Sequence, residues 1–282
     1  MSRRADILEA LKKVDRLPTT IQKALKVLRD PRSDMEALSK VLQLDPGITA
    51  NLLKVANSPY FGSVREITSV RDALVRLGSQ RVFQLMLTSG VAPRLSTEIK
   101  GYGLEPGQLL EHSITVALAA EQLAKELRLT PPDYTFTAGL LADVGKTVLG
   151  TFVGVDAGPI LELARQQGLT FEAAELRVLG IDHAEVGAAL LEYWELPEPI
   201  VNVVRFRLHP DDSPKPDLAL DLVHVADILA KCTGVGLGID GMNYRPSEAV
   251  AQRLKLTPEI LDRCTARIME HVRELKSIFL NN

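Results

Sequence analysis

The sequence predicts an all-α protein. Apolar residues recur at helical spacing along most of the 282 residues, and helix-capping signals separate these stretches. We find neither a strand pattern of any strength nor an internal repeat. The hydrophobic fraction of 46% and the charged fraction of 24% are those of an ordinary globular protein with a substantial core. We therefore expect more than half of the residues to be helical and strand to be nearly absent.

The front part of the chain divides into short helices at clear breaks. Asp45-Pro46 is typical of a helix start, because the aspartate caps the first turn and proline needs no amide hydrogen there. Gly78 is typical of a helix end, because glycine accepts the left-handed backbone of a C-cap. The expected helices are 6–14, Thr19 or Thr20 to about Arg29, one opened by Ser33–Glu36, one from Asp45 to about Ala56, 69–77, and an apolar helix from Ser79.

The remainder of the chain predicts further helices. One that carries His112 begins near Pro106, and Pro131-Pro132-Asp133 introduces the apolar stretch Thr135–Leu149. Residues 151–169 are rich in glycine and interrupted by Pro159, which predicts a loop followed by a helix from that proline. The other expected helices run approximately over 170–180, 182–194, 196–208, 217–232, 246–254 and 257–280.

The stretch Thr135–Leu149 is apolar except at a few positions, two of which carry charge. Asp143 and Lys146 lie three residues apart on what the periodicity predicts to be one helix. Burying an unpaired carboxylate costs several kcal/mol, so Asp143 needs a partner. In the simplest interpretation that partner is Lys146 or a backbone amide. In the functional interpretation it is a metal ion or a ligand phosphate.

The residues around Asp143 resemble a known signature. Residues Gly139–Lys146 read Gly-Leu-Leu-Ala-Asp-Val-Gly-Lys, which is similar to the Gly-Leu-Leu-His-Asp-Ile-Gly-Lys signature of HD-superfamily metal-dependent phosphohydrolases. Ala142 stands where that signature has its histidine. This departure resembles the HDOD family, bacterial signalling domains related to HD-GYP phosphodiesterases whose metal site has decayed.

Other segments extend this resemblance along the chain. Leu17-Pro18, Leu44–Pro46, Val55–Ser58 and Ala73–Gly78 follow the order and approximate spacing of the HDOD family. The resemblance implies an HDOD domain over 11–210, built from an N-terminal helical lobe (1–100) and an HD-like lobe (101–210). Residues 211–282 are then expected to form a helical extension that completes the HD-like lobe.

The resemblance also marks positions of the HD metal site. His112 matches its first histidine, Asp143 the aspartate of the His-Asp dyad, and Asp227 the distal aspartate. His183 matches an additional histidine of HD-GYP-like members. Imidazole and carboxylate groups suit a divalent metal that activates water. The resemblance therefore implies that these four side chains converge in the fold.

Two departures from the signature imply that this metal site is vestigial. Ala142 removes the bridging histidine, and Arg207-Leu208 stands where HD-GYP-like members carry a His-His pair. His209 lies one residue beyond that pair, about 100° away on a continuous helix. A guanidinium at Arg207 adds a permanent positive charge near any cation. We expect no catalytic residue and no cofactor, with a residual divalent metal as the alternative.

Three interpretations of the matching residues stay open. In the first, they form a buried hydrogen-bonded cluster. In the second, they belong to a phosphate or nucleotide pocket whose ligand-binding residues are Lys146 and Arg207. In the third, they retain a metal ion. Asp221, His224 and Asp227 recur every three residues of the predicted helix 217–232. We expect His224 to be a hydrogen-bonded histidine of the core or of a polar seam rather than a ligand.

Bulk properties indicate a cytoplasmic protein. The first residues lack the apolar core of a signal peptide, and no apolar run reaches the roughly 18 residues that span a bilayer. Two cysteines, Cys232 and Cys264, are too few for a disulfide framework and favour a reducing compartment.

Charge is spread unevenly along the sequence. Residues 1–100 hold 17 Lys and Arg against 10 Asp and Glu, and the remaining residues hold 16 against 26. A basic front part favours an acidic partner or nucleic acid. Basic and acidic residues alternate along the predicted helices, however, and no stacking-aromatic or zinc-finger pattern is present. We therefore do not expect nucleic acid or membrane binding.

The expected function is regulatory. We interpret the chain as a non-catalytic bacterial signalling module that binds a partner protein or a small phosphate-containing ligand. The alternative is an enzyme, a metal-dependent phosphohydrolase such as a cyclic-dinucleotide phosphodiesterase. The metal content of the purified protein distinguishes the two.

Overall fold

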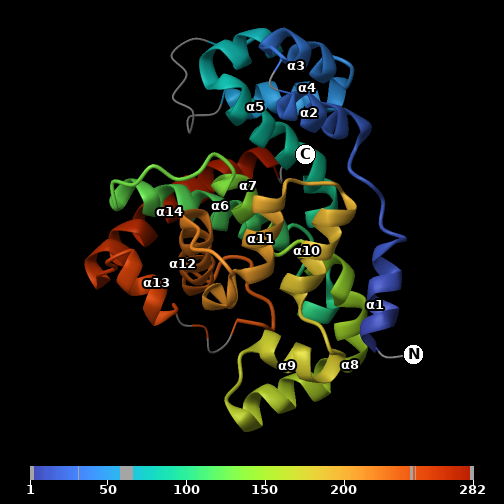
Figure 1. Cartoon of the computed structure of the whole chain (residues 1–282), viewed down its shortest axis with the longest axis vertical. Coiled ribbons are helices and arrows are strands. Elements are labelled where there is room, and N and C mark those ends of the chain that lie inside the picture. The colour runs from blue at the N-terminus through green and yellow to red at the C-terminus, as the bar shows by residue number, and fades with distance from the viewer. Residues whose placement is uncertain (1–2, 31, 58–65, 242–243, 245, 280–282) are drawn as a thin grey trace. The chain divides into compact units, whose positions relative to one another are not determined.

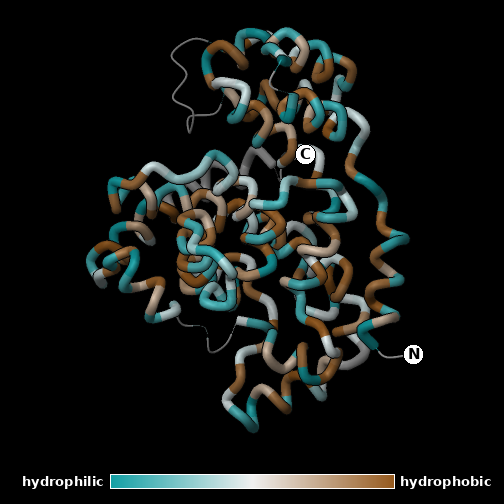
Figure 2. The backbone as a smooth tube through the Cα atoms, viewed as in Figure 1, coloured by the Kyte–Doolittle hydropathy of each residue, from teal (hydrophilic) through white to brown (hydrophobic). Residues whose placement is uncertain are grey.

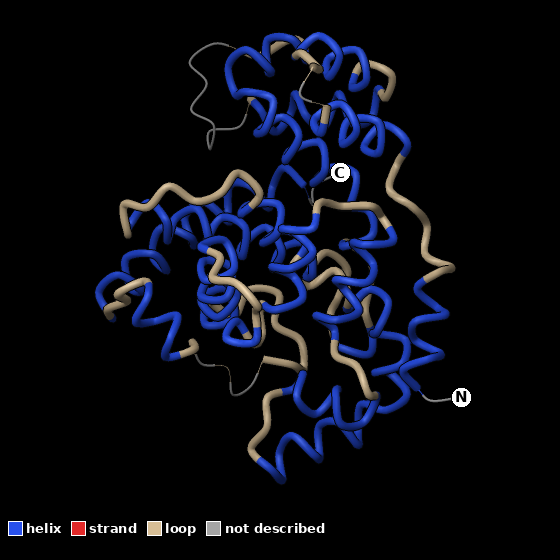
Figure 3. Tube along the Cα trace, viewed as in Figure 1, coloured by secondary structure: helices blue, strands red, loops and turns tan. Residues whose placement is uncertain are grey.

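The described part of the chain is helical throughout. The structure is a computed structural model that describes residues 3–30, 32–57, 66–241, 244 and 246–279. Within these residues the backbone consists of helices and loops, with one isolated β-bridge between Ile99 and Leu104 (Figure 3). The predicted all-α class is thereby confirmed.

Contacts along the chain divide it into two compact units. Unit 1 consists of Met1–Asp15 and Leu95–Glu270, and unit 2 of Arg16–Arg94 and His271–Asn282. The helices that lie in unit 2, apart from the last residue of α5, are α2 (Thr19–Arg29), α3 (Met35–Leu42), α4 (Pro46–Ala56) and α5 (Val70–Leu95) (Figure 1).

The α-helices of unit 1 are more numerous and include the longest buried ones. They are α1 (Arg3–Leu11), α6 (Gln108–Glu126), α7 (Thr135–Leu141), α8 (Lys146–Gln167), α9 (Phe171–Leu179), α10 (His183–Tyr193), α11 (Glu198–Phe206), α12 (Leu218–Cys232) and α13 (Glu248–Arg253). Two 3-10 turns, η2 (Lys100–Tyr102) and η3 (Pro210–Asp212), lie among them. The last helix, α14 (Pro258–Phe279), begins in unit 1 and ends in unit 2.

Capping side chains start α3 and α4 as the sequence predicts, whereas α2 begins after Pro18 without a side-chain cap, so the predicted cap by Thr19 or Thr20 is wrong. The carboxylate of Asp45 accepts a hydrogen bond from the amide of Ile48 at 3.0 Å, as the Asp-Pro pair predicts. The prediction that Ser33 opens α3 was off by one residue, because Asp34 caps the helix instead and accepts from Ala37 N at 2.8 Å. Gly78 interrupts α5 at the predicted break with φ of 80° and ψ of 160°.

The core of unit 1 is built on α6, α7 and α12, which pack against one another. Helices α6 and α12 are buried on nearly all sides, so they lie inside the unit rather than on its surface. Gly139 lets α7 approach α6 closely, since a Cβ atom there would lie 2.9 Å from the Cα of Ala117. Brown and teal segments alternate along the more exposed helices, as amphipathic packing requires (Figure 2).

The stretch Thr135–Leu149 is two helices rather than the predicted one. Helix α7 ends at Leu141, and a turn over 142–145 separates it from α8. Gly145 lies in this turn, where a Cβ atom would lie 2.0 Å from the carbonyl oxygen of His183. This close packing against the start of α10 leaves no room for a side chain, and the apolar periodicity of the sequence did not reveal it.

The predicted loop over residues 151–158 is also wrong. Helix α8 runs without a break from Lys146 to Gln167 and contains Pro159. This helix packs closely on η2, because a Cβ atom on Gly101 would lie 2.0 Å from the carbonyl oxygen of Gly150, and one on Gly150 would lie 2.3 Å from Cγ2 of Ile99. Gly154 and Gly158, which suggested the loop, lie within α8 and do not break it.

One apolar stretch meets the length and composition of a membrane span. It covers Thr135–Gly154, and 83% of its most apolar window is buried inside the protein. The stretch includes the turn over 142–145, which divides it into two shorter helices. Its apolar residues therefore belong to the core of unit 1.

Candidate functional site

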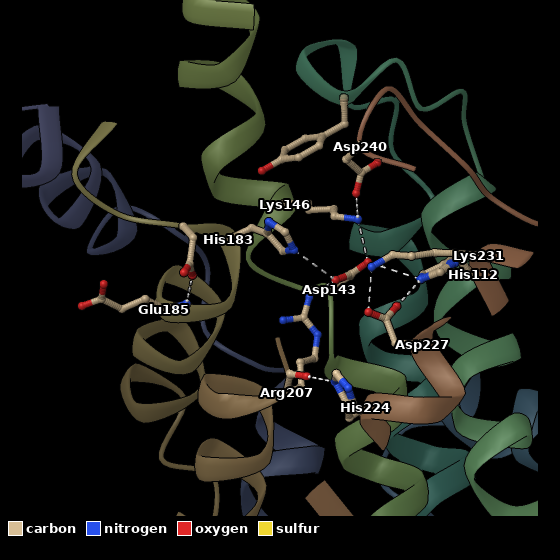
Figure 4. A network of polar contacts seen from close by, with 12 residues as sticks. His112, Asp143, Lys146, His183, Glu185, Arg207, His224, Asp227, Lys231 and Asp240 are labelled. Carbon is tan, nitrogen blue, oxygen red and sulfur yellow. Dashed lines mark hydrogen bonds and ion pairs between the residues drawn. The ribbon is translucent and has the colours of Figure 1, made fainter. Parts of the chain in front are cut away.

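Eight titratable side chains gather inside unit 1, and we call them the charged centre (Figure 4). Each is at most 6% exposed. They come from α6, the turn before α8, the starts of α8 and α10, the residue after α11, α12, and the connection between α12 and α13. The members are His112, Asp143, Lys146, His183, Arg207, Asp227, Lys231 and Asp240.

The structure brings together the four residues that match HD metal positions. His112 Nε2 lies 3.0 Å from Asp227 Oδ1 and 3.4 Å from Asp143 Oδ2. His183 Nε2 lies 3.6 Å from Asp143 Oδ1. Asp143 is therefore the common neighbour of both histidines, although the four residues are far apart in the sequence.

Two basic side chains occupy the two oxygens of Asp143. Lys146 Nζ donates to Oδ2 at 2.7 Å, and Arg207 Nη2 donates to Oδ1. Burial would raise the pKa of the Asp143 carboxyl, but the positive charges of Lys146 and Arg207, with the two histidines, hold that pKa well below its usual range. Asp143 therefore stays ionised, with a cation of the protein on each oxygen.

Asp227 and Asp240 each face an ammonium group as well. Lys231 Nζ donates to Asp227 Oδ2 at 2.7 Å, and the pKa of the Asp227 carboxyl is lowered because Lys231 and His112 outweigh the effect of burial. Lys146 Nζ lies 2.6 Å from Asp240 Oδ2. That contact is an ion pair rather than a well-aligned hydrogen bond. Lys146 thus bridges two carboxylates from different elements.

His183 is held by a buried carboxylate that the sequence did not single out. Its Nδ1 lies 2.7 Å from Glu175 Oε2, and the other oxygen of Glu175 accepts a hydrogen bond from the hydroxyl of Tyr102. Burial lowers the pKa of the His183 imidazole, but the charge and hydrogen bond of Glu175 outweigh it and raise that pKa. His183 and Glu175 therefore form a buried hydrogen-bonded pair beside Asp143.

Three buried cations face three carboxylates inside the centre. Lys146 pairs with Asp143 and Asp240, Arg207 pairs with Asp143, and Lys231 pairs with Asp227. Buried charges are tolerated when they are paired and hydrogen-bonded in this way. Unused polar atoms nevertheless remain, because Arg207 Nε, Arg207 Nη1 and His183 Nε2 have no hydrogen-bond partner in the described structure.

His224 is a hydrogen-bonded core residue, as the sequence predicted. Its Nδ1 lies 2.6 Å from the carbonyl oxygen of Arg207, and its Nε2 accepts from the amide of Ser247 at 2.9 Å. Nδ1 must therefore carry the proton and donate it to Arg207. Burial is the main cause of the lowered pKa of His224. The residue positions the backbone of Arg207, and both of its ring nitrogens are engaged by the protein.

The residues beyond α11 depart from the predicted helix over 196–208. Helix α11 ends at Phe206, and Arg207 is its C-cap. His209 precedes η3 with φ of −133° and ψ of 69°, which are not helical, so it is not on a continuous helix with Arg207. The offset of about 100° expected for His209 relative to Arg207-Leu208 assumes a continuous helix. Because the helix ends before His209, that assumption does not hold.

Four partners of the charged centre were missed from the sequence. Lys231 had a usable signal, since it lies four residues after Asp227 on a predicted helix, where opposite charges pair. Glu175 and Tyr102 had none, because their roles depend on packing between distant segments. Asp240 lies in a Gly-rich connection that resembles a flexible surface loop.

The donor types fit a divalent metal, whereas the neighbouring cations oppose one. Ligand atoms of His112, Asp143 and Asp227 all lie within 4.8 Å of one another, so a buried His/Asp metal site exists in the described structure as a candidate. A divalent ion would add positive charge next to Lys146 and Arg207, and it would compete with both for the oxygens of Asp143.

Comparison with known proteins identifies the family. The model of the HDOD domain matches residues 14–210, which is well over half of the chain. The chain therefore belongs to the HDOD family, as the sequence motifs predicted. A relative described as an uncharacterized protein of Treponema pallidum (strain Nichols) is 23% identical over 214 residues, which are 75% of this chain. The match spans 40% of the length of that relative.

Solved structures of similar fold come from several bacteria. An HDOD domain protein from Geobacter sulfurreducens has 26% identity and a TM-score of 0.69, with 98% of this chain and 96% of that chain covered. A protein from Shewanella amazonensis SB2B, whose name proposes a phosphohydrolase, has 24% identity and a TM-score of 0.71 over 98% and 97% of the two chains. A protein from Marinobacter aquaeolei VT8, whose name proposes a role in signal transduction, has 20% identity and a TM-score of 0.71 over 98% and 65%.

Proposed function

We propose that this chain is a non-catalytic regulatory module of a bacterial signalling system, located in the cytoplasm. The observation that carries this proposal is the engagement of Asp143 by both Lys146 and Arg207. In a metal-dependent hydrolase the corresponding carboxylate must offer its lone pairs to the metal ion. Here an ammonium and a guanidinium use them, and both cations are buried with it.

The position of Ala142 supports the same conclusion. An imidazole beside Asp143 would complete the ligand set and help to lower the pKa of a metal-bound water. A methyl group offers no lone pair. Ala142 is buried at the C-terminal end of α7, directly before Asp143, so no side-chain ligand is supplied there. We therefore expect neither tight binding of a transition metal nor phosphodiesterase activity.

The test combines calorimetry with an enzyme assay. The purified protein is titrated with Mn²⁺ and with Ni²⁺, and hydrolysis of a chromogenic phosphodiester is followed with and without each metal. We expect no saturable binding at micromolar concentrations and no metal-dependent turnover. Tight metal binding together with metal-dependent hydrolysis would contradict the proposal and favour the phosphohydrolase alternative. The observation that supports this alternative is the close approach of the ligand atoms of His112, Asp143 and Asp227.

A regulatory module needs a partner protein or a small ligand, and the charged centre offers donors to a phosphate group. The unused N–H groups of Arg207 and His183 support Arg207 as a ligand-binding residue. Lys146 already faces two carboxylates, so a phosphate that binds there must displace Asp240 or Asp143. Binding of inorganic phosphate and of a cyclic dinucleotide by the parent protein and by Lys146→Ala and Arg207→Lys variants tests this role. Unchanged affinity in both variants would remove it.

A further inference from the structure

A groove on unit 2 is the clearest feature that the charged centre does not use. It is lined by residues of α3, of its C-cap and of the first turns of α5, and has a volume of about 390 Å³. Figure 1 labels both helices. We call it the α3–α5 groove. The side chains that matter for the argument are Met35, Ser39 and Lys40 from α3, and Arg71, Leu74 and Val75 from α5.

The groove concentrates exposed apolar surface. Met35 is 49% exposed and Val75 is 67% exposed, while Leu74 beneath them is buried. Only five large hydrophobic residues in the described part of the chain are exposed, and these two are among them. A third, Leu44, follows the C-terminal end of α3 and is 70% exposed. Apolar residues gathered in this way mark interaction sites more often than isolated ones do.

The charged side chains that line the groove are two basic ones, Arg71 and Lys40, and one acidic one, Glu36. The guanidinium of Arg71 is exposed and has no ion-pair partner among the described residues, and Lys40 pairs only with the exposed Glu36 at 2.8 Å. An exposed pair of this kind is weak and leaves Lys40 able to exchange partners. Unit 2 as a whole holds 14 Lys and Arg against 7 Asp and Glu. An occupant of the groove is therefore expected to be acidic.

The spacing of the lining residues fits a helix better than a nucleotide. Two helices flank the groove, and each offers it residues three or four positions apart, such as Arg71, Leu74 and Val75. An amphipathic helix binds such a surface with apolar residues at i, i+3, i+4 and i+7. None of the described lining residues is aromatic, so these residues offer no stacking platform of the kind on which proteins hold bases of single strands.

We propose that the α3–α5 groove binds an acidic amphipathic helix of a partner protein, an inference that rests on the proposed regulatory function and names its partner surface. Apolar residues of that helix contact Met35, Leu74 and Val75. Carboxylates along its edges pair with Arg71 and Lys40. The apolar contacts supply affinity, and the charge pairs set the direction and the rate of association.

The experiment first selects peptides that bind the groove and then measures their affinity. A phage-displayed library of random peptides of about 16 residues, long enough for a helix to form on binding, is selected on the full-length protein. Phage that also bind a Val75→Glu variant are removed. We expect enriched peptides to share apolar residues at helical spacing and an excess of Asp and Glu. Enrichment of basic peptides, of peptides without that spacing, or of none would overturn the proposal.

Affinity of a fluorescein-labelled enriched peptide then tests the groove residue by residue. We expect Val75→Glu to raise the Kd at least about tenfold and Arg71→Glu about fivefold, as expected for residues at the centre and at the rim. Val75 and Arg71 are exposed, so both variants should keep the circular dichroism spectrum of the parent. The matched control is Lys26→Glu, which makes the same charge change at an exposed lysine on α2 outside the groove.

Lys26→Glu should change the Kd less than twofold. If it weakens binding as much as Arg71→Glu does, net charge alone accounts for the peptide binding and the groove proposal is wrong. Duplex DNA is added as a competitor of the labelled peptide. If DNA displaces the peptide and all three variants lose affinity for DNA equally, the surface binds nucleic acid and the groove proposal is wrong. The metal titration of the unmodified protein is a separate readout. If the peptide selection fails and the protein shows no metal-dependent hydrolysis, only the groove proposal is refuted. If the protein does hydrolyse the phosphodiester with metal, the proposed regulatory function is refuted.

Discussion

Asp143 is the residue on which the regulatory and the enzymatic interpretations differ. In both it is buried, ionised and next to two histidines. The difference lies in what neutralises it. A hydrolase uses a metal ion for that purpose, whereas this chain uses Lys146 and Arg207. Removing one partner of a buried ion pair leaves an uncompensated charge, so these cations are structural as well as inhibitory to metal binding.

Restoring a metal should therefore require two substitutions rather than one. Ala142→His alone supplies an imidazole but leaves the Arg207 guanidinium on Asp143. Adding Arg207→His removes that charge and supplies a second ligand. We expect the double variant to bind Mn²⁺ about tenfold or more tightly than Ala142→His, the scale on which single partners of a metal site act. Calorimetric titration of the parent, the two single variants and the double variant with Mn²⁺ gives the coupling free energy between positions 142 and 207 for metal binding.

A matched control for this cycle is Ala142→His combined with Arg205→His. Arg205 is on α11, two residues before Arg207, and pairs with Glu192 at the surface. We expect this combination to bind no better than Ala142→His alone. Equal affinity of the two double variants would show that Arg207 does not exclude the metal.

The pH dependence of stability should include a contribution from His224. Its pKa is lowered from 6.5 in the folded protein, mainly by burial, so below about 6.5 the unfolded chain takes up a proton that the folded chain resists. Stability is therefore lost as pH falls through that window. Urea unfolding at about pH 7 and at about pH 5, where a free imidazole changes its charge, should show a larger loss for the parent than for His224→Gln.

His183 should act in the opposite direction. Its pKa is raised because Glu175 outweighs burial, so its stabilisation is present below 6.5 and is lost as pH rises through the folded value. The loss caused by His224 must therefore be read from the difference between parent and variant at each pH. An equal loss in both proteins on acidification would show that His224 is protonated in the fold.

At the scale of the elements, the turn between α7 and α8 is what brings the charged centre together. It orients Asp143 toward α6 and α10 and starts α8 at Lys146, so that the two side chains meet. Gly145 makes the turn possible by packing on the backbone of α10, where a Cβ atom would lie 2.5 Å from the amide nitrogen of Gly187. The site depends on backbone contact between two helices rather than on periodicity along one.

Helix identity was predictable from the sequence, while close helix packing was not. Local capping chemistry at Asp45, Asp182 and Asp217 located helix starts, and each of these aspartates accepts the expected backbone hydrogen bond. The glycines in and after the apolar stretch misled the prediction, because Gly145 serves a contact between distant segments and Gly154 lies inside α8 without breaking it. Such contacts leave no trace in the spacing of neighbouring residues.

The candidate site was predictable to the extent that its residues belong to a motif. His112, Asp143, His183 and Asp227 were located by their resemblance to HD positions, and the structure brings them together. Asp240, which neutralises Lys146, comes from a connection without a motif. A carboxylate in a Gly-rich segment is most often exposed, so only the folded chain shows that this one is buried.

Two glycines test whether packing or helix propensity decides the fold here. Gly145→Ala places a methyl group against the backbone of α10 and should destabilise by about 1–3 kcal/mol or more, as overpacking does. Gly158→Ala, in α8, meets no atom within 4 Å and should be neutral or stabilise by about 0.5–1 kcal/mol. Urea unfolding measures both. Equal effects of the two substitutions would show that α10 can move away from Gly145.

At the scale of the whole molecule, the residues before the family match belong to unit 1. The HDOD match begins at residue 14, yet Ile7 and Leu11 of α1 are buried, and α1 packs on α8 and α10. Arg4 pairs with Glu185. The single tryptophan of the chain, Trp194, donates to the carbonyl oxygen of Asp15 at 3.0 Å. The helical segment at the start of the chain is therefore part of the unit that holds the charged centre.

This arrangement gives unit 1 a spectroscopic signal of its own. Trp194 is buried in unit 1 and reports its unfolding, whereas far-UV circular dichroism reports the helices of both units. Unit 2 is much the smaller and buries a smaller fraction of its surface, which favours lower stability. During urea unfolding we therefore expect the circular dichroism signal to begin its decline at a lower concentration than the tryptophan signal.

A pair of core substitutions assigns the two transitions. Ile7→Ala in α1 should lower the midpoint of the tryptophan transition by the equivalent of about 2–5 kcal/mol, because it opens a cavity under a fully buried side chain. Leu25→Ala, at a buried position of α2 in unit 2, should move the early circular dichroism transition by a similar amount and leave the tryptophan midpoint unchanged. If each substitution instead shifts both signals together, the two units unfold as one cooperative structure, and a partner that binds unit 2 would then stabilise the charged centre as well.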